Sequence, residues 1–192
     1  MWTILSAGAL TPKQAFGISA LTFALSVALF TVADYSWSFI FLGGFSFSCL
    51  ALNAWIDACT STLIRIWTNT AACAMLLIWV IEAIIGDCYT SVYAVCTAGA
   101  VWIIARALSY RNPTHFGSGD ARLLFVLAGL TFVRGLVAVL LCICLASALQ
   151  VGAILYMQAR ARQRALHLSS SLPFGPALVM SAWIVCAWAF LI

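Results

Sequence analysis

Seven long apolar runs, separated by short polar gaps, account for most of this sequence. They lie at about residues 15–33, 38–56, 67–86, 88–105, 121–133, 135–157 and 174–192. Most are close to the roughly 20 residues that a helix needs to cross a hydrocarbon core of about 30 Å. A run in lipid must be helical, because an open strand would leave its backbone groups without hydrogen-bond partners. The runs predict an all-α transmembrane helical bundle of about seven spans.

Charged residues are too few for this chain to cover a water-facing surface. They make up 7% of its 192 residues, whereas 65% are hydrophobic. A soluble domain of this length carries about 25% charged residues. We therefore expect membrane lipid to surround most of the exterior, and the length leaves room for one domain over residues 1–192.

The basic residues lie in the gaps between the apolar runs, which is typical of membrane topology and not of nucleic-acid binding. With the N-terminus in the cytoplasm, Arg134 falls on the outer side together with Asp34 and Asp87, and the other eight basic residues fall on the inner side. These eight are Lys13, Arg65, Arg106, Arg111, Arg122, Arg160, Arg162 and Arg164. This orientation places both Asp57 and Asp120 on the cytoplasmic side.

The stretch 121–157 is too long for one straight span, because it would measure about 55 Å at 1.5 Å per residue. Arg134 is its only charge, and Gly135 follows directly. We therefore expect the helix to break at these two residues. The first part, 121–133, is then only about 20 Å long, so Asp120 would lie close to the membrane boundary, sheltered from bulk water.

Two of the five acidic residues lie where chemistry is expected. Asp57 ends the second run, and Asp120 follows two glycines and begins the fifth. Ionisable residues at membrane depth are rare and usually functional. By contrast, Asp34 and Asp87 fit solvated outer turns, and Glu82 fits an interfacial position or pairing with a polar neighbour.

Two neighbouring carboxylates cannot both ionise easily, so they share a proton. The ionised member can activate water as a general base, and the protonated member can donate to a substrate carbonyl. Gly117 and Gly119 would allow backbone conformations that a Cβ blocks. The structural alternative is that Asp120 only caps a helix N-terminus. Asp57 has no such explanation, because the helix dipole disfavours an anion at a C-terminus.

Residues 117–124 read Gly-Ser-Gly-Asp-Ala-Arg-Leu-Leu and resemble the G-x-G-D-x-K-L-L signature of type IV prepilin peptidases, which are GxGD membrane aspartyl proteases. Asp57 stands at the expected distance upstream, and Gly129 resembles the family's Ala-Leu-Gly stretch. Residues 172–178 read Leu-Pro-Phe-Gly-Pro-Ala-Leu and resemble the family's I-P-F-G-P-x-L entry into its last span. The likeness covers roughly residues 40–192, so that residues 1–36 form an N-terminal span and residues 37–192 a prepilin-peptidase-like core.

The resemblance implies an endopeptidase that removes the leader from pilin-like precursors at the cytoplasmic face of the bacterial inner membrane. The family's two catalytic aspartates match Asp57 and Asp120, with Gly117, Gly119 and Arg122 as the supporting motif. Arg122 stands where the family usually has Lys, and Leu63-Ile64 stands where it often has Ile-Pro or Leu-Pro. The sequence lacks the four-cysteine cytoplasmic insert of the larger bifunctional members, so it resembles the compact, peptidase-only form more closely, and the resemblance leaves open whether the chain is also an N-methyltransferase.

Other readings remain open. The chain could be a related GxGD enzyme that acts on a different membrane substrate, a non-catalytic membrane subunit of a pilus, secretion or conjugation machine, or a small transporter that uses Asp57 and Asp120 as proton sites. His115 and His167 are weaker candidates on inner loops. None of the eight cysteines forms a C-x-x-C pair, so we expect no metal or cofactor, and the expected partners are a precursor protein and lipid, with no nucleic acid.

Overall fold

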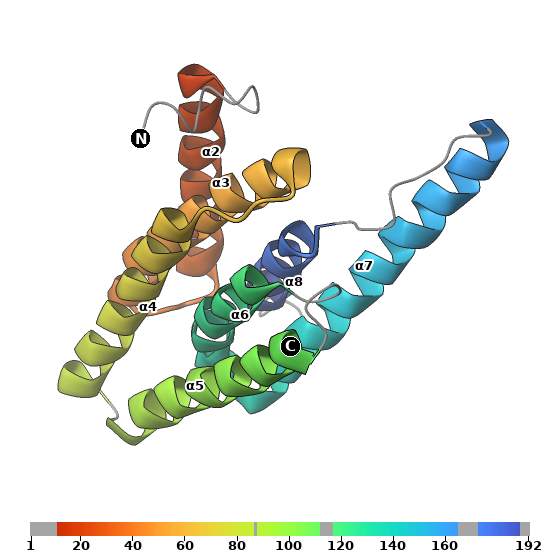
Figure 1. Cartoon of the computed structure of the whole chain (residues 1–192). Coiled ribbons are helices and arrows are strands. Elements are labelled where there is room, and N and C mark those ends of the chain that lie inside the picture. Colours follow the sequence, from red (N-terminus) through yellow and green to blue (C-terminus); the bar gives the residue numbers. More distant parts are fainter. Residues whose placement is uncertain (1–10, 87, 112–116, 165–172, 189–192) are drawn as a thin grey trace.

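The computed structural model describes residues 11–86, 88–111, 117–164 and 173–188, and within these ranges it contains helices and no strand. Figure 1 shows their arrangement. The α-helices are α2 (Pro12–Val32), α3 (Gly44–Thr60), α4 (Arg65–Ile85), α5 (Cys88–Arg111), α6 (Ser118–Thr131), α7 (Leu136–Arg164) and α8 (Gly175–Ala187). A π-helical segment, η1 (Phe39–Gly43), leads into α3, and a 3₁₀ turn, η2 (Phe132–Arg134), follows α6. The prediction of an all-α bundle is confirmed.

Each apolar run contains a helix, but the helices differ in their ability to cross a membrane. Five are long and apolar enough by length and composition: Pro12–Val32, Phe39–Thr60, Arg65–Ile85, Cys88–Arg111 and Leu136–Ala159. The helices α6 and α8 have only 14 and 13 residues, short of the roughly 20 that a full span needs. A multi-pass membrane protein is compatible with this pattern, and seven remains a predicted number of spans.

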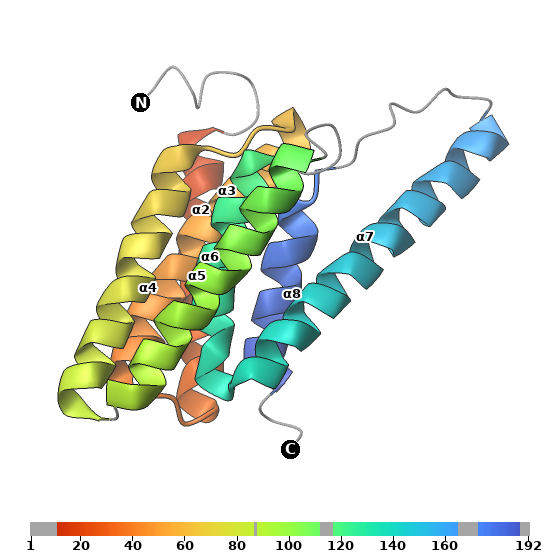
Figure 2. The same ribbon diagram turned by 60° about the horizontal axis from the view of Figure 1, so that its bottom comes forward.

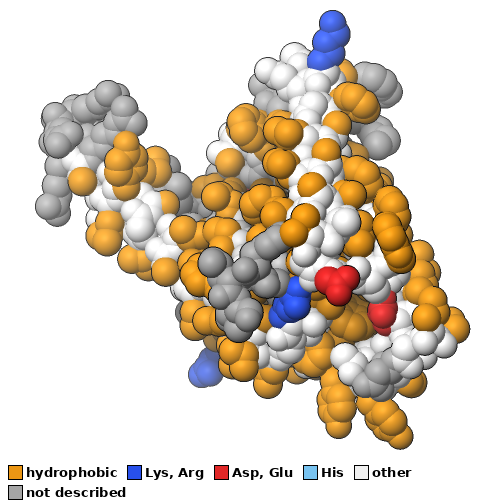
Figure 3. Space-filling model, turned by 180° about the vertical axis from the view of Figure 1, so that it is seen from behind, with side chains coloured by type: hydrophobic (Ala, Val, Ile, Leu, Met, Phe, Trp, Pro, Cys, Tyr) orange, Lys and Arg blue, Asp and Glu red, His pale blue; other side chains and the backbone are white. Residues whose placement is uncertain are grey.

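The exterior of the bundle is apolar. Figure 3 shows hydrophobic side chains spread over one whole face of the molecule, with few charged side chains among them. Large hydrophobic side chains such as Phe16, Ile84 and Ile85 are more than three-quarters exposed. In water such a continuous apolar surface would drive association, so its natural neighbour is lipid.

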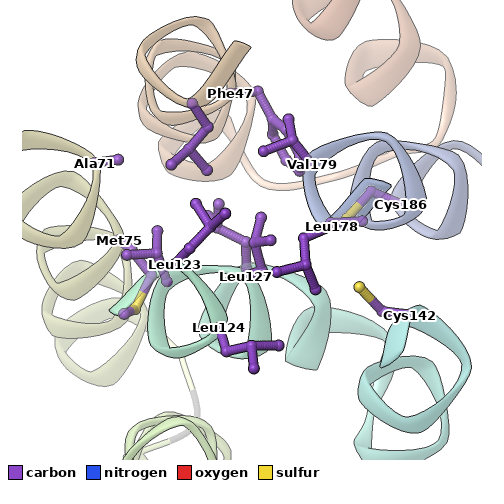
Figure 4. Packing of buried hydrophobic residues seen from close by; sticks show 14 of the residues in the cluster. Phe47, Ala71, Met75, Leu123, Leu124, Leu127, Cys142, Leu178, Val179 and Cys186 are labelled. Atoms are coloured by element: carbon purple, nitrogen blue, oxygen red, sulfur yellow. The ribbon is translucent and has the colours of Figure 1, made fainter. Parts of the chain in front are cut away.

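The core lies where α3, α4, α6 and α8 meet. Figure 4 shows Leu123 and Leu127 of α6 between side chains of the three other helices, among them Phe47, Met75 and Leu178, and all five are almost fully buried. A Cβ built on Gly129 would lie 2.5 Å from the Met75 sulfur. The absence of a side chain at that position therefore lets α6 approach α4 closely.

The expected break at Arg134 and Gly135 is present. Gly135 has a φ of 85°, which L side chains rarely adopt, and α7 begins at the next residue. Arg134 donates from Nε to the Tyr35 hydroxyl at 2.7 Å and from Nη2 to the Ala33 carbonyl at 2.9 Å. The α7 helix then leaves the bundle at a wide angle, as the two views of Figures 1 and 2 agree.

Candidate active site

Asp57 lies in the last turn of α3, near the helix end that the sequence predicted. Its side chain is only 5% exposed, and within the described part of the chain its Oδ2 atom makes no well-formed hydrogen bond. The helix ends four residues later at Ser61, whose φ of 54° is left-handed and whose N–H donates to the Asp57 carbonyl. The Gly175 backbone N–H interacts with the Asp57 carboxyl group, but it makes no well-formed hydrogen bond with Oδ2. A buried carboxylate oxygen that is not fully bonded is uncommon in native proteins and calls for an explanation such as catalysis or an ordered water.

Asp120 lies at the start of α6, but not before it as the apolar run suggested. The helix begins at Ser118, because polar residues can form a first turn that hydropathy alone does not detect. Asp120 is the third residue of that turn, and its Oδ2 accepts a hydrogen bond from the Gly117 N–H at 3.2 Å. The helix dipole and this donor both stabilise an anion here.

Both aspartates line one cavity of about 450 Å³ at one end of the bundle. The C-terminal end of α3, the α3–α4 loop and the N-terminal ends of α4 and α6 form its walls, together with the segment leading into α8. Asp120 lies outside the five helices long enough to span a membrane. Burial raises the pKa of Asp120 to about 6, the Gly117 hydrogen bond opposes this shift, and the negative charge of Asp57 adds to it. The two carboxyl groups are therefore close enough to influence each other's ionisation.

The glycines of the predicted motif act through space and not through unusual dihedral angles. Gly117 has φ −75° and ψ 149°, a conformation that any residue adopts, so the expected need for conformational freedom was wrong there. A Cβ on Gly117 would lie 3.3 Å from the Asp120 Oδ2 atom, and a Cβ on Gly119 would lie 3.0 Å from Leu63 Cδ1. Arg122, the remaining member of the motif, lines the cavity with Arg65.

Gly175, at the start of α8, is a site residue that the sequence analysis did not identify. A Cβ built on it would come within 2.6 Å of Asp57 Oδ2, so only glycine allows the α8 backbone to lie against this carboxylate. Pro173 and Phe174, just before it, line the cavity. The signal was present in the Pro-Phe-Gly-Pro stretch, which we noted as a likeness without assigning it a role in the site.

Asn53 is a second unforeseen residue. It lies one turn before Asp57 on α3 and is fully buried. Its Oδ1 accepts from the Ile64 N–H at 2.8 Å, and its Nδ2 donates to the Thr68 hydroxyl, also at 2.8 Å. Asn53 thus ties the start of α4 to the helix that carries Asp57. An asparagine inside an apolar run gave no indication of these partners.

The remaining acidic candidates behave as the sequence suggested, where they can be followed. Asp34 is exposed in the turn after α2, and Glu82 accepts hydrogen bonds from the Ser36 and Ser38 hydroxyls. Both belong to the end of the bundle away from the cavity. Asp87, His115 and His167 lie outside the described residues.

Comparison of the chain with protein-family models, curated proteins and solved structures gives no match in any of the three. The resemblance to prepilin peptidases therefore rests on short motifs alone, and the function must be argued from the geometry of the site.

Proposed function

We propose that this chain is a membrane aspartyl endopeptidase that cleaves the leader from pilin-like precursors at the cytoplasmic face of the bacterial inner membrane. One observation carries the proposal: Asp57 and Asp120, which come from different helices, line a single cavity in a chain that has only five acidic residues. Paired carboxyl groups in a sheltered cavity are the arrangement that aspartic proteases use.

The surroundings of the two carboxyl groups suggest different roles for them. Asp120 accepts a backbone hydrogen bond at a helix N-terminus, which favours the ionised form, so we assign it as the general base. Asp57 lies near a helix C-terminus and its Oδ2 has no well-formed hydrogen bond within the described residues, so we assign it the shared proton.

In this assignment, Asp120 takes a proton from water, whose oxygen attacks the carbonyl carbon of the substrate peptide bond. Asp57 donates its proton to the carbonyl oxygen as the tetrahedral intermediate forms. The C–N bond then breaks as Asp120 gives its proton to the leaving amine, and a hydroxyl group of the intermediate returns a proton to Asp57. The products are a carboxylic acid and an amine, and the reaction consumes one water molecule.

The substrate class comes from the resemblance to prepilin peptidases, and the position of the cavity in an apolar bundle supports it. Arg65 and Arg122 line the same cavity, and the excess of basic residues in the inner gaps predicts that this end faces the cytoplasm. A pilin-like precursor would place its apolar helix in the bilayer, beside the apolar exterior of the bundle, and its cleavage site at the cavity. Docking of that helix would hold the peptide bond near the aspartates, which is a proximity effect.

The direct test is co-expression of the full chain with several pilin-like precursors, read as a shift in precursor size. Wild type is expected to cleave at least one of them, whereas Asp57→Asn and Asp120→Asn abolish cleavage at equal protein levels. Asp34→Asn is the matched control, because Asp34 is exposed, lies at the other end of the bundle and has a left-handed φ of 55° that asparagine tolerates.

Cleavage that survives either mutation would refute the proposed mechanism. If wild type cleaves none of the precursors, the non-catalytic subunit is favoured. A proton-coupled flux that both Asp→Asn variants lose would instead favour a transporter.

A further inference from the structure

Leu63 lies between two backbone segments, one that precedes Asp120 and one in α8 that lies against the Asp57 side chain. A Cβ built on Gly119, which precedes Asp120, would lie 3.0 Å from Leu63 Cδ1. A Cβ built on Gly175, which lies against Asp57, would be 3.4 Å from Leu63 Cδ2. The two methyl groups of Leu63 therefore lie close to both backbone segments. A side chain at position 119 would crowd the leucine, whereas one at position 175 would meet it at ordinary van der Waals distance.

The backbone on either side of Leu63 is fixed by α3 itself. The Ile64 N–H, next to Leu63, donates to the Asn53 side chain, and the same side chain donates to Thr68 in the first turn of α4. Asn53 and Asp57 are four residues apart, so they lie on the same face of α3. The position of Leu63 is thus fixed relative to the helix that carries Asp57, while its side chain packs against the backbone next to Asp120.

We propose that Leu63, held in place by Asn53, is a positioning residue that sets the separation of the Asp57 and Asp120 carboxyl groups. This inference rests on the proposed function, because a fixed separation matters only if the two groups act together. Cores are close-packed, so a smaller side chain leaves space that neighbours fill only in part. Without the leucine, the backbone at Gly119 can shift, and displacements of about 1 Å at a catalytic site can lower rates about 100-fold.

An ordinary packing role would give a different result. Removing a leucine that only fills space lowers the unfolding midpoint and, by letting water into the cavity, also acts on the pKa of Asp120, because burial is the main cause of its raised pKa. A positioning role predicts in addition that the influence of Asp57 on the titration of Asp120 changes, because the interaction between two charged groups depends on their separation. The experiment must therefore read titration separately from stability.

The first arm measures cleavage of one precursor by purified full-length Leu63→Ala, Leu63→Met and Asn53→Ala. For Leu63→Ala we expect kcat to fall about 10- to 100-fold with a nearly unchanged KM. Asn53→Ala changes kcat in the same direction, and Leu63→Met, of similar volume, stays near wild type. The matched control is Leu29→Ala. Leu29 is a half-buried leucine near the C-terminal end of α2, so its loss can lower the unfolding midpoint but leaves kcat unchanged.

The second arm needs no substrate. A carbodiimide modifies protonated carboxyl groups, and mass spectrometry of Asp120 modification against pH gives a titration midpoint. Among the described residues, the charged side chains that line the cavity with Asp120 are Asp57 of α3, Arg65 of α4 and Arg122 of α6 itself, and Arg106 and Arg111 of the neighbouring α5 do not line it. The influence of Asp57 is measured as the shift of the Asp120 midpoint that Asp57→Asn causes. We expect this shift to change in the Leu63→Ala background and to keep its wild-type size in the Leu29→Ala background.

The two arms separate failure of this inference from failure of the proposed function. A wild-type chain that cleaves no precursor refutes the peptidase, but the labelling midpoint still decides whether Leu63 separates the two carboxyl groups. The inference is overturned if Asp57→Asn shifts the Asp120 midpoint equally in wild type and in Leu63→Ala, even if the kcat of Leu63→Ala falls. An unchanged kcat in an active Leu63→Ala enzyme overturns it as well.

Discussion

The two ends of the bundle differ in how completely their charged side chains are hydrogen-bonded. At the end away from the cavity, Glu82 accepts from two serine hydroxyls, and Arg134 donates to the Tyr35 hydroxyl and the Ala33 carbonyl. At the cavity end, one carboxylate oxygen, Asp57 Oδ2, makes no well-formed hydrogen bond within the described residues. Burying a polar group without a partner costs free energy, and Glu82 and Arg134 avoid that cost.

This difference shows that the presence of a charge in a membrane protein identifies a site less well than its bonding does. Glu82 and Asp57 both lie in helices long enough to span a membrane, and by rarity alone each would be a candidate. Glu82 has hydroxyl partners that account for its position. The incomplete bonding of Asp57, next to a second carboxylate, is what singles out the cavity end.

Among the substitutions at the cavity end, we expect the largest loss of activity at Gly175. Gly175→Ala places a Cβ 2.6 Å from Asp57 Oδ2, so the carboxylate or α8 must move. We expect a loss of cleavage of about 100-fold or more, measured as kcat/KM on one precursor. Gly99→Ala in α5, where a Cβ would meet no atom within 4 Å, is the control. Equal activity of the two variants would mean that the contact between α8 and Asp57 does not matter for catalysis.

The pH dependence of cleavage tests the role of Asp120 at the cavity end. Burial, partly opposed by the Gly117 hydrogen bond, raises the pKa of Asp120 from its ordinary value of 3.8 to about 6. If ionised Asp120 is the base and protonated Asp57 is the acid, kcat/KM rises about tenfold per pH unit below about pH 6 and falls again at the higher pH where Asp57 loses its proton.

The same shift acts on stability with a defined sign. Because the folded chain holds this proton more tightly than the unfolded chain, the stabilisation is complete below about pH 4 and is lost as the pH rises to about 6. Unfolding midpoints of wild type and Asp120→Asn over this range measure the contribution. A flat rate profile between about pH 5 and 8 would contradict the role of Asp120 as the base.

The sequence predicted much of the fold because lipid imposes simple rules on it. Apolar runs of sufficient length must be helices, and the pair Arg134-Gly135 must interrupt one of them. The ends of the helices were harder to predict from the sequence. The helix α6 begins at Ser118 and α7 continues to Arg164, because a helix can extend through polar residues beyond the apolar run. The lengths of α6 and α8 depend on packing that hydropathy does not contain.

The site was predictable only in part, for a related reason. Asp57 and Asp120 stood out because acids are rare in this chain. Gly175, Leu63 and Asn53 have side chains that are unremarkable in an apolar sequence, and their importance comes from contacts between segments far apart in the chain. Gly175 is 118 residues from Asp57 in the printed numbering, and no local pattern connects them.

We expect the smallest effect from a substitution of Tyr35, at the end of the bundle away from the cavity. The Tyr35 hydroxyl donates to the Cys186 carbonyl of α8 at 3.1 Å and accepts from Arg134 at 2.7 Å. Tyr35→Phe removes both hydrogen bonds and is expected to lower stability by about 1–3 kcal/mol, measured by the unfolding midpoint in detergent. Tyr93→Phe, at a tyrosine that is 63% exposed, controls for the loss of a hydroxyl as such and should be nearly neutral.

We expect the cleavage rate of Tyr35→Phe and its pH profile to stay at wild-type values. A change in either would show that the two ends of the bundle are not independent. The helix α8 runs from Gly175 beside Asp57 to Cys186 beside Tyr35, so it contacts both charged clusters. If Tyr35→Phe shifts the pH profile, α8 transmits the loss of this distant contact to the aspartates. The cluster away from the cavity would then act as a support for the active site and could not be treated as an independent stabilising element.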